Sequence, residues 1–156
     1  MVIRNYTAAD KYFCIEVFKS NLPQYFDHAE LPLFIAWLEK QDLGEPGHSG
    51  SIEDHYYVVE LPEKGIVGCG GFYVAKDINE IRFAWGMIHS DIHKHGLGTE
   101  LSKFRIMKMK EGWPNHKITL GTSQHTFPFY EKMGMKVVKI IPKGYSEELD
   151  RYDMEL

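Results

Sequence analysis

Hydrophobic residues recur with two different spacings in the first half of the chain. Apolar residues at helical spacing run from Thr7, which suits a helix N-cap, to about Asn21. A second helical pattern begins at Leu31, and three stretches rich in Val, Ile, Tyr, Phe and Trp follow it with short polar turns between them. We therefore predict two helices and then an antiparallel meander. The predicted strands of the meander are His55–Leu61, Gly65–Ala75 and Glu80–His89.

The second half of the chain alternates between helix and strand. After a turn with two glycines, an apolar stripe predicts a helix whose opposite face is expected to carry charged side chains, Arg105 among them. The stripe consists of Leu97, Leu101, Phe104 and Met107. The other predicted elements are a helix over Thr126–Met133, a polar loop over Pro142–Asp150, and strands over Val2–Tyr6, Lys117–Ser123, Met135–Ile141 and Arg151–Leu156.

The predicted elements follow the order β-α-α-β-β-β-α-β-α-β-β. One mixed, mostly antiparallel sheet with helices on both faces satisfies this order, so we predict an α/β (α+β) fold. A chain of 156 residues with 44% hydrophobic residues can bury one full core, and we expect a single domain over residues 1–156. The segment Asp42–Asp54 is rich in glycine and has no period, and its length suggests a mobile lid.

Charge and composition exclude several classes of protein. The net charge is −4 with acidic and basic residues interleaved, so the basic surface of a nucleic-acid-binding protein is absent. No apolar run approaches the roughly 18 residues of a transmembrane helix, and the N-terminus does not resemble a signal peptide. Cys14 and Cys69 have apolar neighbours, as buried free thiols of a cytoplasmic protein do. The eight histidines show no metal-ligand spacing, so we expect no metal.

The junction between the strand Glu80–His89 and the following helix carries the strongest chemical signal. Gly96 and Gly98 lie one residue apart where the helix begins. Such a turn aims backbone N–H groups at one point, at the positive end of a helix dipole, and so suits a phosphate or pyrophosphate. Leu101 occupies the place of the third glycine of the dinucleotide fingerprint, and the Gly-Lys-Ser/Thr of a Walker loop is absent.

Two segments resemble the signatures of the GNAT superfamily of N-acetyltransferases. The segment 93–98, His-Lys-His-Gly-Leu-Gly, resembles the acyl-CoA loop Arg/Gln-x-x-Gly-x-Gly/Ala, although His93 replaces Arg or Gln. The segment 124–135 resembles the second signature, Asn-x-x-Ala-x-x-Phe/Leu-Tyr-Glu-Lys-x-Gly-Phe. Tyr130 and its neighbours Glu131 and Lys132 match this signature, whereas Gln124 stands where Asn is usual.

The resemblance implies a site where the strands Glu80–His89 and Lys117–Ser123 are parallel neighbours that splay apart. Backbone N–H groups near Met87 and Ile88 would face the acyl carbonyl, and Tyr130 would protonate the leaving thiolate. The candidate general base is Glu80, with His89 as the alternative. The residues expected to contact CoA are His93, Lys94, His95, Gly96, Leu97, Gly98 and Thr99 in the turn, and Ser123 and Gln124 at the pantetheine arm.

The function implied by the resemblance is transfer of an acetyl group from acetyl-CoA to a primary amine of a small molecule or peptide. Two alternatives stay open: a non-catalytic acyl-CoA sensor, and an enzyme that uses another short acyl-CoA such as propionyl-CoA or succinyl-CoA. The segments expected to wall the acceptor site, Lys19–Glu30 and Pro142–Asp150, are acidic, which favours a cationic amine by steering. The sequence leaves the oligomeric state, a homodimer included, undecided.

Overall fold

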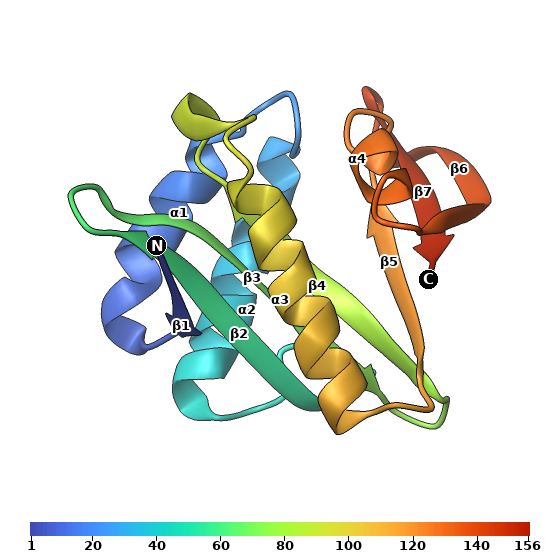
Figure 1. The fold of residues 1–156 in the computed structure, drawn as a ribbon. Coiled ribbons are helices and arrows are strands. Elements are labelled where there is room, and N and C mark those ends of the chain that lie inside the picture. The colour runs from blue at the N-terminus through green and yellow to red at the C-terminus, as the bar shows by residue number, and fades with distance from the viewer.

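The computed structural model describes residues 1–156 and contains one mixed sheet with helices on both faces (Figure 1). The strand order is β1-β2-β3-β4-β5-β7-β6, and only the neighbours β4 and β5 are parallel. The strands are β1 (Val2–Asn5), β2 (Ser51–Leu61), β3 (Gly65–Ala75), β4 (Glu80–Ile88), β5 (Lys117–Thr122), β6 (Lys136–Ser146) and β7 (Leu149–Glu155). The helices are α1 (Lys11–Ser20), α2 (Leu31–Leu43), α3 (Leu97–Gly112) and α4 (Phe127–Glu131).

Successive side chains of β2 point to opposite faces of the sheet, so the hydrophobic core has one part on each face. Tyr56 and Val58 pack with α1 and α2, whereas Tyr57 and Val59 pack on the side of α3. In Figure 1, α1 and α2 accordingly lie behind the sheet and α3 crosses in front of it. Cys14 is buried as a free thiol in the core under α1 and α2, as the sequence predicted.

The predicted order of elements and fold class are confirmed. The bounds of β3 are those predicted, and β4 ends one residue earlier than expected, at Ile88. Thr7 and Asp10 form a capping box at the first helical turn, because the side chain of each bonds to the backbone of the other. The periodic segments were therefore well defined by their apolar spacing and their caps.

Two segments predicted as loops are shorter in the structure than expected. β2 begins at Ser51, so only residues 44–50 are irregular between α2 and β2. Asp54 holds this segment in place, because its carboxylate accepts a hydrogen bond from the Gly47 N–H at 2.6 Å. Most of Pro142–Asp150 belongs to β6 and β7. β6 is an edge strand with mostly exposed side chains, so it carries little of the apolar alternation that marks a buried strand.

The strands β4 and β5 pair over a short distance and then separate. Only Glu80–Arg82 of β4 pair with Lys117–Thr119 of β5. Beyond that point β4 pairs with β3 alone and β5 with β7, and the two strands diverge toward the start of α3 (Figure 1). The splay that the family resemblance implied is therefore present.

Candidate active site

The turn between β4 and α3 leaves three backbone N–H groups free. The N–H of Glu100 makes the first hydrogen bond of α3, to the Gly96 carbonyl at 3.1 Å, and no protein acceptor lies against the N–H groups of residues 97–99. Gly96 has a φ of +83°, in the left-handed region that glycine adopts without strain. Lys94 and His95 are exposed beside it. The start of this helix can therefore receive an anion from solvent.

His93 turns away from this anion site. Its Nε2 lies 2.8 Å from the Ile88 carbonyl oxygen, and its ring packs edge-on against Tyr25 at a centroid distance of 5.2 Å. The buried Asn21 donates to the same carbonyl through Nδ2 at 3.0 Å. His93 and Asn21 thus hold the turn against the end of β4, and the structure does not place the His93 ring where a phosphate would bind.

Backbone N–H groups of Gly86 and Ile88 face the space between β4 and β5. The His89 N–H donates to the Val67 carbonyl, on the side of β3, at 2.8 Å. N–H directions alternate along an extended strand, so the N–H groups of Ile88 and Gly86 point away from β3, where β5 has already diverged. The N–H of Met87 faces β3. Gly86 therefore replaces Met87 as a candidate donor to an acyl carbonyl.

A β-bulge at Trp85 sets these directions. Trp85 has a φ of +46°, which side chains of L-residues rarely adopt, and the register with β3 shifts here. The Tyr56 hydroxyl donates to the Trp85 carbonyl at 2.8 Å. The Trp85 ring packs against Phe34 at 5.3 Å and Phe26 at 6.2 Å between centroids. These contacts hold the bulge, and the bulge changes which N–H groups face the gap.

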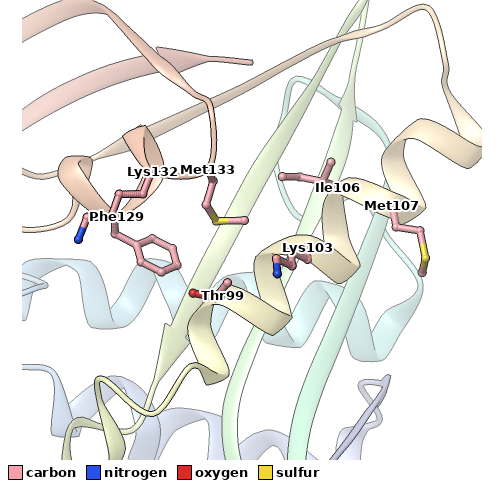
Figure 2. Close-up of a pocket in the computed structure, with 7 residues that line it drawn as sticks. All are labelled: Thr99, Lys103, Ile106, Met107, Phe129, Lys132 and Met133. Atoms are coloured by element: carbon pink, nitrogen blue, oxygen red, sulfur yellow. The ribbon is translucent and has the colours of Figure 1, made fainter.

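A groove of about 620 Å³ lies between α3 and α4 (Figure 2). Phe129 of α4 points across it toward Thr99 of α3, and a Cβ added to Gly98 would lie 3.6 Å from the Phe129 ring. Lys103 and Lys132 add two cations close to the helix start. No motif in the sequence marks either lysine as a site residue, although Thr99 and Lys103 are spaced to share a helix face. The lining residues are Thr99, Lys103, Ile106, Met107, Phe129, Lys132 and Met133.

Tyr130 stands over β4 where the two strands separate. Its ring lies 6.0 Å from the ring of Phe83, which follows the last residue of β4 that pairs with β5. Tyr130 is half-buried, and its hydroxyl bonds to no protein group. A phenol with a free hydroxyl at this point can donate a proton to a group bound between the strands.

Ser123 and Gln124 are occupied by other contacts. The Gln124 side chain donates to the Glu148 carbonyl at 2.8 Å and accepts from the Asp150 N–H at 2.9 Å, so it fastens the β6–β7 hairpin. The Ser123 hydroxyl accepts from the His125 N–H at 3.3 Å, at the turn before α4. The structure therefore does not direct either side chain toward a pantetheine arm, and the longer reach of Gln compared with Asn explains the first difference.

The two candidate bases lie at opposite ends of β4. Glu80 opens the strand, six residues before Gly86, which corresponds to roughly 20 Å along an extended chain. His89 directly follows the strand, and its Nδ1 accepts from the Asp91 N–H at 3.2 Å. A proton could therefore pass from an amine near Gly86 to Glu80 only through water.

Arg105 is buried against the bulge. Its side chain is 1% exposed and lies 4.3 Å over the Phe83 ring. Nη1 donates to the Gly71 carbonyl at 3.3 Å and Nη2 to the Ser102 hydroxyl at 3.2 Å, but Nε has no partner. A Cβ added to Gly86 would lie 2.6 Å from Nη1, so any side chain there would displace the guanidinium. A positive charge thus lies next to the backbone that faces the gap.

This burial corrects the prediction that Arg105 belongs to the charged face of its helix. The residues of α3 that face the sheet are Leu101, Arg105 and Met109, whereas the predicted stripe residue Met107 is 44% exposed. The long apolar stem of arginine packs like a hydrophobic side chain, and the glycines of β3 and β4 accommodate its head. The spacing alone could not distinguish this face from the predicted one.

No group of three His, Cys, Asp or Glu side chains gathers as the ligands of a metal ion would. None of the helices is both long and apolar enough to span a membrane.

Comparison with known proteins places this geometry among solved structures. No protein-family model and no curated protein matches the sequence. A GNAT-family protein from Desulfovibrio desulfuricans superposes with a TM-score of 0.78 at 15% identity, over 99% of this chain and 97% of its own. An aminoglycoside 6'-N-acetyltransferase in complex with coenzyme A has a TM-score of 0.73 at 18% identity, over 100% of this chain and 96% of its own.

A ribosomal-protein-alanine N-acetyltransferase from Brucella melitensis has a TM-score of 0.75 at 16% identity, over 100% of this chain and 99% of its own. All three matches therefore extend over the whole sheet and its helices. The matched proteins differ in their acceptors, so the likeness bears on the framework of the site. With the splayed strands β4 and β5 and the glycine turn before α3, these matches identify the fold as the acyl-CoA N-acyltransferase fold.

Proposed function

We propose that this protein transfers an acetyl group from acetyl-CoA directly to a primary amine. The observation that carries the proposal is the presence of two groups of unused hydrogen-bond donors at the same end of the β4–β5 gap. One group is the N–H groups of residues 97–99 at the start of α3, and the other is the N–H groups of Ile88 and Gly86 in the gap. A phosphate-bearing thioester of extended shape uses such a set, and a neighbour of the same fold was crystallised with coenzyme A.

The residues present suit each part of acetyl-CoA. The pyrophosphate would accept hydrogen bonds from the N–H groups of residues 97–99, with Lys103 and Lys132 as nearby cations. The pantetheine arm would lie in the gap beside β4, where β5 leaves the edge of the strand unpaired. The acyl carbonyl would then face the N–H of Gly86, with the Arg105 guanidinium behind it.

The proposed reaction needs no covalent enzyme intermediate. The nitrogen of the neutral amine attacks the acyl carbon, and the N–H of Gly86 stabilises the charge that develops on the carbonyl oxygen. The carbon–sulfur bond breaks, and the leaving thiolate takes the hydroxyl proton of Tyr130. The new amide nitrogen loses one proton, and Tyr130 regains its proton through solvent, so the products are the N-acetylated amine and CoA.

Release of free thiol from acetyl-CoA in the presence of a panel of amines tests the proposal. Tyr130→Phe should lower kcat by about 10²–10⁴-fold while acetyl-CoA affinity changes little, because a general acid acts only during the chemical step. The matched control is Tyr12→Phe, which removes the hydroxyl of an exposed tyrosine on α1 and should leave kcat unchanged. Acetyl-CoA binding without transfer to any amine would instead indicate a non-catalytic acyl-CoA sensor.

A further inference from the structure

A cluster of polar side chains lies on the face of the sheet opposite α3. Arg82 of β4 pairs in register with Thr119 of β5 and with Tyr73 of β3. Ile118 and Leu120, the neighbours of Thr119, pack in the core under α3, so Thr119 and its cross-strand partners face the other side. This face borders the same splay of β4 and β5 as the proposed thioester site, but it is reached from the side of α1 and α2.

The cluster continues onto the β6–β7 hairpin through Gly121. Gly121 lies two residues after Thr119 and so faces the same side. A Cβ added to Gly121 would lie 2.8 Å from the Tyr145 hydroxyl and 3.3 Å from Nε of Arg151. The Arg151 Nε also donates to the Asp153 carboxylate at 2.7 Å, so Arg151 forms an ion pair within the protein.

Two members of the cluster have binding capacity that the protein does not use. No carboxylate lies within ion-pairing distance of Arg82, a partly buried arginine whose guanidinium lies beside the Tyr73 hydroxyl. The Thr119 hydroxyl is buried without any hydrogen-bond partner, and the residue as a whole is 7% exposed. A guanidinium without a carboxylate partner, next to a buried hydroxyl without any partner, matches the donors that a carboxylate requires.

Negative charge lies at the other side of the same cluster. Glu30, at the start of α2, accepts from the Asp27 N–H at 2.8 Å, and burial raises the pKa of its carboxyl group. Its charge reaches Tyr145, whose pKa is raised to about 12 by burial, with Arg151 opposing the rise and Glu30 adding to it. The cluster therefore offers one ligand a cation without a carboxylate partner and a carboxylate that bonds only to a backbone N–H.

We propose that the acceptor is an amine that also carries a carboxylate, namely an amino acid or a small zwitterion of the same kind. Arg82 and the Thr119 hydroxyl bind its carboxylate, and Glu30 provides the negative charge that attracts its ammonium group. Arg82 lies four residues before Gly86, roughly 13 Å along the strand, so its long side chain and a small acceptor together span the distance to the acyl carbon.

This inference rests on the proposed acetyl transfer and narrows its acceptor. From the sequence, the acidic segments Lys19–Glu30 and Pro142–Asp150 favour a cationic amine. The structure places Arg82 and Arg151 among them, and the free charge of Arg82 would repel a polyamine at this position. A zwitterion satisfies both signs of charge.

The test compares amino acids with the amines that lack only the carboxylate, for example phenylalanine with 2-phenylethylamine, with acetyl-CoA as the donor. The wild type should acetylate at least one amino acid with a kcat/KM about 10-fold or more above that of its decarboxylated partner. Arg82→Gln should raise KM for that amino acid by about 10–100-fold and leave KM for acetyl-CoA and for the plain amine unchanged. Arg82→Lys should restore part of the loss, and Lys64→Gln, which removes an exposed charge from the β2–β3 turn, should have no effect.

Equal use of the amino acids and the plain amines, or an equal loss for both in Arg82→Gln, would overturn the inference. Acetylation of plain amines alone would also overturn it, while acetyl transfer itself would stand. Absence of acetyl-CoA binding in calorimetry would instead remove the proposed function, and with it this inference.

Discussion

A substitution at Gly98 should raise the stability of the free protein and weaken the binding of acetyl-CoA. It lies in the first turn of α3, and its φ is not in the left-handed region. A Cβ added there would meet Phe129 at 3.6 Å and Ile88 at 3.8 Å, which are ordinary van der Waals distances. The free protein therefore accepts alanine at this position, and the added methyl group occupies the space between α3 and α4 through which the cofactor would pass.

The expected magnitudes have opposite signs. Because glycine costs helix stability relative to alanine, Gly98→Ala should raise the free energy of unfolding by about 0.5–1 kcal/mol. In a protein of this size that raises Tm by about 1–4 °C. Extra atoms in a packed site cost about 1–3 kcal/mol, so Gly98→Ala and more strongly Gly98→Val should weaken acetyl-CoA binding by roughly 5- to 150-fold.

Urea unfolding and calorimetric titration with acetyl-CoA measure the two effects. Gly112→Ala is the matched control, because Gly112 ends the same helix and a Cβ there meets nothing within 4 Å. This control should show a similar gain in stability and no change in the dissociation constant. An unchanged dissociation constant in Gly98→Val would refute the placement of the ligand, and a loss of stability in Gly98→Ala would refute the account of the backbone.

The remaining predictions concern the bulge and the N-terminal ion pair. Tyr56→Phe should lower the free energy of unfolding by about 1–3 kcal/mol, because it leaves the Trp85 carbonyl without its donor, and it should lower kcat as the bulge relaxes. Burial alone would raise the pKa of Asp10, but hydrogen bonds from Arg4 and Thr7 bring it below the usual value. Asp10→Asn should therefore cost about 1–3 kcal/mol at pH 7 in urea unfolding, and the difference from wild type should vanish as the pH falls through the lowered pKa.

Each of these two predictions has a result that contradicts it. Normal kcat in a destabilised Tyr56→Phe would show that the bulge does not position the proposed donors. A stability difference for Asp10→Asn that persists at pH 2 would show that a neutral packing effect, and not the ionised carboxylate, accounts for the loss.

Much of the fold could be predicted from apolar spacing because most elements have one buried side. The bounds of β3 and the caps of the first helical turn followed from this pattern. The β6–β7 hairpin did not, because an edge strand is held by backbone pairing and its side chains remain polar. The loop before β2 is shorter than expected for a different reason: its last four residues belong to β2, which pairs with β3.

The parts of the candidate site that depend on backbone geometry could be predicted from the sequence. The hydrogen-bond partners of its side chains could not. The glycine turn needed only the strand–turn–helix pattern, and the splay beside Ile88 was implied by the family resemblance. The sequence could not show that His93 and Gln124 bond to backbone carbonyls, since either side chain reaches several partners. Arg105 left an indirect signal, because the glycines in β3 and β4 are the space that its guanidinium occupies.

Amide hydrogen exchange measured by NMR, with and without acetyl-CoA, tests the central claim most directly. In the free protein the amides of Gly86 and Ile88 should exchange quickly, because they face the gap, whereas that of Met87 should exchange slowly, because it faces β3. Saturating acetyl-CoA should protect Gly86 and Ile88 and leave Met87 unchanged. Protection that is absent from Gly86 and Ile88 while acetyl-CoA is bound would contradict the proposed site.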